Sequence, residues 1–276
     1  MTGSRAFVDE TWRRDDRGRY YILLGVVVDD SVGARPLMAE FHAVAARWGG
    51  SVHATEMCRT QEGRDDLAGL ERSIEAAPAI RLVCAVRAPI PWGARRIEAA
   101  RQRCVAELSF RAARLGVREL VFDSRNSKDP HAAPQERRAD KNDQATILDL
   151  RRAGELPDDV RAWHRDDRHT NELWLADVAC RTVRDALLTD DPIRLSPLAH
   201  LLEIREARLL PVSERSGLEV RAAPESGLSF HLADLVMRAR RVGSEPERGP
   251  SSFGRPHGSD WWRDRSLGDH LGIAER

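Results

Sequence analysis

The sequence predicts an α/β fold in which a mixed β-sheet is flanked by helices and is followed by a C-terminal extension. Two observations lead to this prediction. Two apolar segments, residues 6–9 and 20–28, are joined by a short polar link, and this pattern predicts an antiparallel hairpin. After the hairpin, β-branched runs alternate with segments of helical periodicity, as is typical of a sheet with helices packed on its faces.

The other elements follow from periodicity and from the residues that end each segment. Apolar residues at helical spacing predict a helix over 33–48, ended by Gly49, and a long helix over 93–115, ended by Gly116. Residues 124–145 are polar and are expected to form a mobile loop. The remaining expected strands are 80–86, 118–123 and 160–164; the remaining expected helices lie near 67–74, before residue 150, and over 172–188 and 226–242.

Length and composition predict one principal domain. With 276 residues, 41% of them hydrophobic, the chain can bury one large core. The alternation of strands and helices weakens after residue 190. We therefore expect a domain over 1–190, a helical or irregular extension over 191–242 and a flexible tail over 243–276. The tail is rich in Gly, Pro, Ser and Arg, and Trp261 and Trp262 within it form a possible docking element.

The charge balance excludes a global electrostatic field. Lys and Arg number 44, as do Asp and Glu, so that the formal net charge is zero and any basic surface must be local. Only Lys128 and Lys141 are lysines, and the remaining cations are arginines. Arginine suits bidentate phosphate contacts. The abundance of Ala, Arg, Gly and Asp is equally what a GC-rich genome produces.

Cysteine usage and hydropathy predict a cytoplasmic protein. The four cysteines are scattered without the C-x-x-C spacing of zinc or redox sites, so we expect reduced, buried or half-buried thiols. The sequence starts without a basic-then-apolar signal, and its apolar runs are shorter than the roughly 18 residues of a membrane span. We therefore expect no membrane partner.

Three aspartates, Asp9, Asp123 and Asp177, lie where mostly apolar runs meet polar sequence. If the strands that end at Asp9 and Asp123 are parallel neighbours, both side chains emerge at one end of the sheet. The helix that carries Asp177 could then face them. Three such carboxylates would repel one another and raise a pKa, which Mg²⁺ or Mn²⁺ would relieve. In the alternative interpretation, the two strand-end aspartates are simple caps and Asp177 is a half-exposed helix residue.

Two further acids and a histidine are candidates for the same site. Glu10 follows Asp9, so on a regular strand its side chain points to the opposite face, and it joins the site only if the strand ends or bulges there. Glu56 is a candidate fourth carboxylate. His53, three residues earlier, could share one side of a helical turn with it and bind metal or a substrate phosphate. A solvated capping turn is the alternative for this pair.

Other candidates lie near the expected substrate path. Arg125, in the polar loop after Asp123, could contact a phosphate chain, and His164 could shuttle protons near the metals. An ordinary solvated loop and a surface histidine are the alternatives. Asp234 has a sequence context like that of Asp177 and is its rival for completing the site, although it lies outside the regular alternation of elements.

The order of these motifs resembles the domain-of-unknown-function 3800 family. The motifs are Phe7-Val8-Asp9-Glu10-Thr11, Gly25-Val26-Val27-Val28, His53-Ala54-Thr55-Glu56, Val121-Phe122-Asp123 and Leu175-Ala176-Asp177-Val178-Ala179. They span roughly residues 5–188. The resemblance implies a ribonuclease H-like fold and an acidic site of Asp9, Glu56, Asp123 and Asp177. The chain departs from the family pattern at Thr11-Trp12, where Ser-Gly is usual, and this departure affects the placement of Glu10.

The expected function is that of a nuclease. Asp9, Glu56, Asp123 and Asp177 are the expected catalytic residues; with Glu10 they would hold Mg²⁺ or Mn²⁺ for in-line hydrolysis of a DNA or RNA phosphodiester. His53, Arg125 and His164 would contact substrate, and the arginines at 238, 240 and 241 could hold its backbone.

Two other functional classes are open. One is a non-catalytic ribonuclease H-like module that binds nucleic acid or a protein, or that forms a homo-oligomer through the C-terminal region. The neutral net charge favours this module. The other class is a glycoside hydrolase with paired carboxylates. The aromatic content of 5% gives it little support.

Overall fold

The computed structural model describes residues 4–15, 18–30, 32–89, 95–124, 139–207 and 228–244. Met1–Ser244 belong to one compact unit. The expected tail over 243–276, except for its first two residues, lies outside the described residues, and so do Trp261 and Trp262. Within the described segments, no helix is both long enough and apolar enough to cross a membrane.

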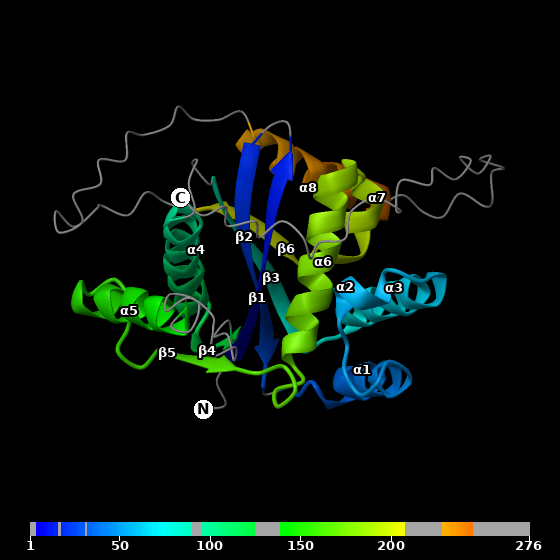
Figure 1. The fold of residues 1–276 in the computed structure, drawn as a ribbon, viewed down its shortest axis with the longest axis horizontal. Coiled ribbons are helices and arrows are strands. Elements are labelled where there is room, and N and C mark those ends of the chain that lie inside the picture. Colours follow the sequence, from blue (N-terminus) through cyan, green and yellow to red (C-terminus); the bar gives the residue numbers. More distant parts are fainter. Residues whose placement is uncertain are drawn as a thin grey trace, which may run out of the picture. The chain divides into compact units, whose positions relative to one another are not determined.

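The described strands form one mixed sheet in the order β5-β4-β1-β2-β3-β6 (Figure 1). β1 pairs with β2, and β2 with β3, in antiparallel orientation, so that the predicted opening hairpin is confirmed. β4 runs parallel to β1, β5 to β4, and β6 to β3. The strands are β1 (Ser4–Asp15), β2 (Gly18–Asp29), β3 (Ile80–Pro89), β4 (Val117–Asp123), β5 (Arg161–Arg165) and β6 (Leu202–Glu206).

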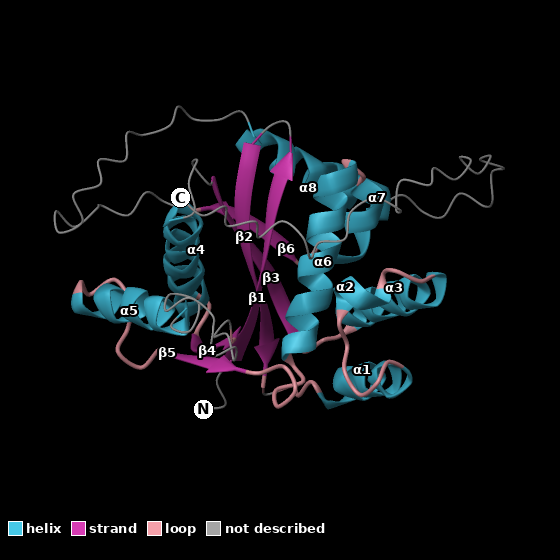
Figure 2. Ribbon diagram, viewed as in Figure 1, coloured by secondary structure: helices cyan, strands magenta, loops and turns pink. Residues whose placement is uncertain are grey.

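Helices cover both faces of this sheet, which confirms the predicted α/β class (Figure 2). α4 and α5 pack on one face, and the other α-helices pack on the opposite face. The helices are α1 (Arg35–Arg47), α2 (Ala54–Met57), α3 (Gln61–Ala76), α4 (Arg95–Arg114), α5 (Ala139–Arg152), α6 (Leu173–Thr189), α7 (Pro192–Leu195), the 3-10 helix η2 (Ser196–Leu198) and α8 (Leu228–Ser244).

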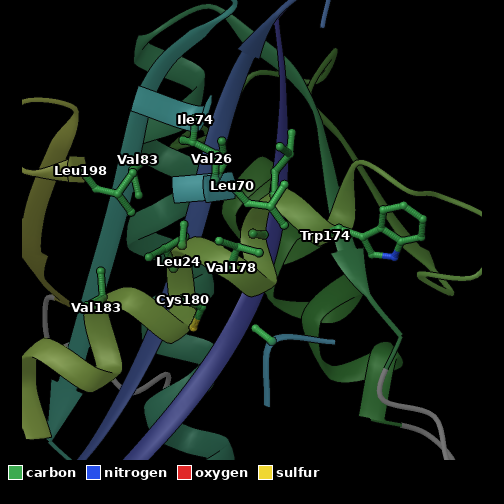
Figure 3. Close-up of a cluster of buried hydrophobic side chains, with 14 of the residues drawn as sticks. Leu24, Val26, Leu70, Ile74, Val83, Trp174, Val178, Cys180, Val183 and Leu198 are labelled. Atoms are coloured by element: carbon green, nitrogen blue, oxygen red, sulfur yellow. The ribbon is translucent and has the colours of Figure 1, made fainter. Parts of the chain in front are cut away.

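Strand alternation divides the buried side chains into two cores, one on each face. Leu24 and Val26 of β2 point toward α6 and α3, where Val178, Cys180 and Leu70 meet them (Figure 3). The β2 residues that alternate with Leu24 and Val26 face the opposite way, toward α4 and α5. We call these two sides the α6 face and the α4 face. Because successive strand residues alternate between the faces, the face of each candidate site residue follows from its position.

Two expectations about element boundaries need correction. The first strand does not end at Asp9, because its pairing with β2 continues to Asp15, and Asp9 is therefore an interior residue of β1. The extension expected over 191–242 is not separate from the domain. Its segment Leu202–Glu206 forms β6 beside β3, and Leu235 and Ala239 of α8 join the core of the α6 face. The Leu-Glu-Ile-Arg-Glu alternation of β6 was a strand signal that sequence reading missed.

Several local signals are confirmed. α4 ends at Arg114, and Gly116 follows with φ of 81°, a left-handed conformation that glycine adopts without a Cβ clash. The four cysteines are free and buried, as expected. Burial raises the pKa of the Cys84 thiol to about 12, and that of Cys104 likewise, so both thiols stay protonated at neutral pH.

Candidate functional site

Strand register brings Asp9 and Asp123 together. Val8 of β1 pairs with Phe122 of β4 in the parallel register, and Asp9 and Asp123 are the next residues on these two strands. Phe7 and Val121, two residues earlier, both point into the core of the α6 face. The two aspartates therefore point to that face as well. β4 ends at Asp123, so the carboxylates lie where the parallel part of the sheet stops.

α6 brings the third aspartate to the same place. Its apolar stripe packs on β1 and β2, so that Asp177, near the start of the helix, lies over the carboxyl end of β4. The backbone N–H of Ala54 donates a hydrogen bond of 2.9 Å to Oδ2 of Asp177. This bond joins α6 to α2 and thereby holds the segment that carries His53 and Glu56 at the site.

The one-turn helix α2 carries the fourth predicted carboxylate. His53 is the N-cap residue of α2, and Glu56 lies in its first turn with an exposed side chain. The turn packs closely against the start of α3, whose cap Thr60 accepts a hydrogen bond of 3.0 Å from the N–H of Gly63. Arg64 of α3 also donates to the carbonyl oxygen of Cys58 at 2.9 Å. α2 is therefore held by its contacts with α3 and by the hydrogen bond to Asp177.

A fifth carboxylate, Asp167, was not predicted. It follows β5, the parallel neighbour of β4, so that it emerges at the same end of the sheet as Asp123. Its Oδ2 lies 3.5 Å from Nδ1 of His53. The signal for Asp167 was present in the sequence, because Asp166-Asp167 follow an expected strand in the way that Asp123 follows another.

These residues surround one cavity of about 380 Å³. Its carboxylates come from β1, β4, α2, α6 and the segment after β5, and the cationic or ionisable basic side chains in its wall are Arg59 and His53. The wall consists of Asp9, His53, Thr55, Glu56, Arg59, Asp123, Asp167, Leu173, Trp174 and Asp177. The cavity therefore brings together the four acids predicted to be catalytic, and it adds Arg59 and Asp167, which the sequence reading did not assign.

The cavity favours the protonated forms of its central carboxyl groups. Burial, followed by repulsion from the negative charge of Asp167, raises the pKa of Asp123 to about 6. Burial also raises the pKa of Asp9 well above its ordinary value, and repulsion from Asp177 and Asp123 adds to this effect. The positive charge around these carboxylates therefore does not balance their negative charge, as expected of a site that binds a cation.

The pKa of Asp177 is also raised, although two neighbouring groups oppose the rise. Burial raises its pKa, whereas the hydrogen bond from Ala54 and the charge of a protonated His53 act in the opposite direction. The negative form of Asp177 is therefore stabilised by two groups of the α2 segment.

Glu10 does not join the cavity, which corrects its expected role as a metal ligand. β1 continues as a regular strand through this position, so Glu10 points to the α4 face and forms an ion pair with Arg101. Arg101, 1% exposed, also binds Asp143 at 2.7 Å and donates to the hydroxyl of Tyr21 at 2.6 Å. This network lies directly behind the cavity, and the charge of Arg101 opposes the rise in the pKa of Asp9.

His164 also lies on the α4 face, which corrects its expected contact with substrate. It pairs with Phe122 in the β4–β5 register and stacks on the ring of Phe122, with centroids 5.3 Å apart. Its Nε2 lies 3.0 Å from Oδ2 of Asp143, and its side chain is 4% exposed. It is a buried member of the Arg101 network.

The structure excludes Asp234 as the rival of Asp177 in the cavity. Asp234 lies on α8, away from the cavity wall, with a side chain that is 61% exposed and paired with Arg238 at 2.8 Å. Arg238 also binds Asp190, and Arg240 donates to backbone carbonyls of Ala199 and Leu202, so these arginines hold the fold rather than face the cavity. Arg125 lies outside the described residues.

The donor set suits a hard divalent cation, although the ligands are not drawn together. Mg²⁺ and Mn²⁺ favour carboxylate oxygens and water, and Mg²⁺ usually keeps several waters. The raised pKa values of Asp9 and Asp123 show the excess negative charge that such a cation offsets. Within the described segments, no group of three or more His, Cys, Asp or Glu side chains is already arranged to hold a metal ion.

No protein-family model, curated protein or solved structure matches this chain. The fold and the cavity together define an α/β protein that has an acidic cavity at the end of the parallel half of a mixed sheet.

Proposed function

We propose that the protein is a divalent-metal-dependent nuclease that hydrolyses phosphodiester bonds of DNA or RNA in the acidic cavity. The observation that carries the proposal is the meeting of Asp9, Asp123 and Asp177. These residues come from three elements that are far apart in the sequence, and the pKa of each is raised. Clustered, half-buried carboxylates are costly for a fold, and a bound cation that serves the reaction would offset that cost.

We further propose a ribonuclease H-like fold and membership of the domain-of-unknown-function 3800 family. The mixed sheet, in which an antiparallel half that begins with the hairpin adjoins a parallel half, is compatible with that fold. The chain also presents the motif residues Asp9, Glu56, Asp123 and Asp177 around one cavity, as the resemblance implies. β6 adds a strand beside β3 at the edge of the antiparallel half.

Asp9, Asp123 and Asp177 would hold Mg²⁺ or Mn²⁺, with Glu56 at the open rim. When bound, the metal supplies activation of water and stabilisation of charge on phosphate and leaving-group oxygens. The chain's own contribution is position and charge. β1 and β4 fix two carboxylates on neighbouring strands, and the Ala54–Asp177 hydrogen bond fixes the third relative to α2.

Two other cavity residues suit contact with a phosphodiester. Arg59 offers a planar guanidinium that binds phosphate oxygens with two parallel hydrogen bonds. His53 contacts Asp167 through Nδ1 and keeps Nε2 for a proton or a phosphate oxygen. The pair could therefore bind the substrate phosphate opposite the carboxylates.

A non-catalytic binding module of the same fold is the second candidate. Two observations favour it: the formal net charge is zero, and the carboxylates in the described segments are not already arranged around a metal. In this candidate function, the cavity would lack hydrolytic activity and the protein would bind nucleic acid or a protein partner.

Hydrolysis can be tested with end-labelled single-stranded and double-stranded DNA and RNA in Mn²⁺. We expect the wild-type chain to cleave at least one of these substrates and Asp123→Asn to lose that cleavage. Asp149→Asn removes the same charge from a side chain of α5 that is 74% exposed, and it should cleave like the wild type. Equal cleavage by Asp123→Asn and the wild type would refute the site. Absence of cleavage of every substrate would refute the enzyme and leave the binding module.

A further inference from the structure

The outer strand of the sheet continues the surface of the acidic cavity. In the parallel register, Trp163 of β5 pairs with Val121 of β4, and Arg165 pairs with Asp123. Paired residues of neighbouring strands point to the same face, so Trp163 and Arg165 share the α6 face with Asp123. Standard strand spacing and rise place the Cα atoms of Trp163 and Asp123 about 8 Å apart. Trp163 is thus close enough to meet a base next to a phosphodiester in the cavity.

Within the described segments, the β5 part of the α6 face is more open than the centre of the sheet. α6 packs mainly on β1 and β2 and less on β4, and β5 is the edge strand (Figure 1). Arg161, Trp163 and Arg165 are all exposed, whereas the residues between them are half-buried. Trp163 is 39% exposed, and the other large exposed apolar residues of the described segments are aliphatic. An exposed tryptophan on an open sheet face is a typical contact residue.

Arg165 adds a positive charge beside the exposed ring of Trp163. The guanidinium carbon of Arg165 lies 5.5 Å from the centroid of the Trp163 ring, within the range of a cation–π contact. Within the described part of the chain, Arg165 forms no ion pair with a carboxylate, and its charge is available to a ligand. The carbonyl oxygen of Arg165 accepts a hydrogen bond of 2.9 Å from Ser124, which fixes it beside Asp123. Arg161 lies beside Glu119 in the register, as Arg165 lies beside Asp123.

We propose that the β5 surface, formed by Arg161, Trp163 and Arg165, binds unpaired bases and phosphates of a single-stranded nucleic acid whose adjoining phosphodiester lies in the acidic cavity. The proposal rests on the proposed nuclease function and adds the substrate class. A base stacks on an indole ring only when its own face is open, as in single strands. The cation of Arg165 complements the phosphate that follows such a base.

The neutral net charge agrees with this mode of binding. A protein without a global positive field gains little from long-range attraction to a duplex, so affinity must come from local contacts. Stacking contributes about 1–3 kcal/mol per base by alanine substitution and is tolerant of sequence. One tryptophan, and one arginine that forms no ion pair within the described residues, can therefore set the preference for single strands beside the cavity.

Fluorescence anisotropy in EDTA tests the surface without hydrolysis. The full chain is titrated into labelled oligothymidylate, oligouridylate and a duplex of equal length; the two single strands show whether deoxyribose or ribose is favoured. We expect both single strands to bind more tightly than the duplex. Trp163→Ala should weaken single-strand binding by about tenfold or more, and Trp163→Phe should retain most of it because its ring still stacks. Arg165→Ala should lower the salt dependence by about one counterion.

Two exposed residues provide matched controls. Ile193→Ala on α7 removes a side chain of a residue that is 64% exposed, and Arg152→Ala on α5 removes a cation whose side chain is 71% exposed. Both should bind oligonucleotides like the wild type. Thermal melting of every variant verifies folding. If Trp163→Ala has a lowered melting temperature, the oligonucleotide affinities of Arg165→Ala and Trp163→Phe test the surface instead.

The experiments test the proposed β5 surface and the proposed nuclease function independently. Wild-type affinity in Trp163→Ala, or tighter binding of the duplex, overturns the β5 surface even if cleavage depends on Asp123. A change in self-association without a change in oligonucleotide affinity also overturns it, since the occupant is then a protein. If no substrate is cleaved but Trp163→Ala still loses single-strand affinity, the nuclease is refuted and the surface stands.

Discussion

Asp9 of β1 and Asp123 of β4 are adjacent on parallel strands, one residue beyond the Val8–Phe122 pair, and both side chains face α6. The fold accepts two half-buried acids here, and α6 adds Asp177. Because the pKa of each is raised, the site costs folding free energy when it is empty and ionised. Function and stability at this cavity are therefore coupled, and four predictions follow from named contacts.

Metal-free protein should lose stability as the pH rises from about 4 to about 6. The pKa of Asp123 is raised to about 6 in the folded chain from an ordinary value of 3.8, so the folded state keeps a proton that the unfolded state releases. The contribution of Asp123 to the free energy of unfolding then falls across this window, by about 1 kcal/mol for a partly exposed group, and levels off above it.

Urea unfolding in EDTA at several pH values measures this effect, and Asp123→Asn should flatten the slope. Asp66 and Glu203 have lowered pKa values and contribute the opposite trend, but they are present in both proteins and cancel in the difference. An identical slope in wild type and Asp123→Asn would contradict the raised pKa.

Asp9→Asn should stabilise the metal-free protein at neutral pH and abolish its response to metal. The substitution removes a half-buried carboxyl group whose ionisation is opposed by desolvation and by repulsion from Asp177 and Asp123, and it also removes a proposed ligand. We expect the melting temperature to rise in EDTA and the further increase with Mn²⁺ to disappear, whereas the wild type should gain stability with Mn²⁺. Asp149→Asn serves as the exposed control. A wild type that shows no metal response would argue against the metal site.

Gly63→Ala should destabilise the protein and disturb the cavity rim. A Cβ on Gly63 would overlap the backbone carbonyl of Met57, the last residue of α2, so α2 and α3 would have to separate. The cost should be about 1–3 kcal/mol, as for other overpacked sites. Because α2 carries Glu56, cleavage should fall as well.

Gly69→Ala is the matched control for this change. Gly69 lies on the same helix, and a Cβ there would meet no atom within 4 Å. Alanine should therefore raise stability by about 0.5–1 kcal/mol through helix propensity. Chemical denaturation of both variants measures the difference, and equal effects of the two substitutions would contradict the close approach of α2 and α3.

Arg101→Leu should be among the most destabilising single substitutions on the α4 face. Its removal leaves Asp143, whose side chain is fully buried, and Glu10 without their cation, and breaking a buried ion pair in this way costs about 3–5 kcal/mol. Arg152→Leu, at a well-exposed position, should change stability by less than about 0.5 kcal/mol.

A double-mutant cycle tests whether Arg101 acts through Asp143. Arg101→Leu combined with Asp143→Leu should lose less stability than the sum of the two single losses, because no lone charge remains in the pair. The pKa of Asp9 should also rise further in Arg101→Leu, since Arg101 lowers it in the wild type. Additive losses would show that the pair is not coupled.

Much of the site could be predicted because strand chemistry is local. Apolar runs that end in Asp9, Asp123 and Asp177 were visible as patterns, and the expectation that two of them lie on adjacent parallel strands is confirmed by the register. The role predicted for Glu10 required the first strand to end or bulge after Asp9, whereas β1 continues as a regular strand, and the role predicted for His164 rested on its place at the end of an expected strand. Strand alternation directs each of them to the α4 face, where Arg101 and Asp143 bind them.

The sequence by itself determined most of the elements, the α/β class and the candidate acids, because periodicity and residue chemistry act over a few neighbours. Only the tertiary structure decided that β1 extends past Asp9, that residues 202–206 complete the sheet, and that Asp167 and Arg59 join the cavity. The physical reason is that register, pairing order and the docking of α2 on α3 depend on contacts between residues far apart in the chain. No local pattern records those contacts.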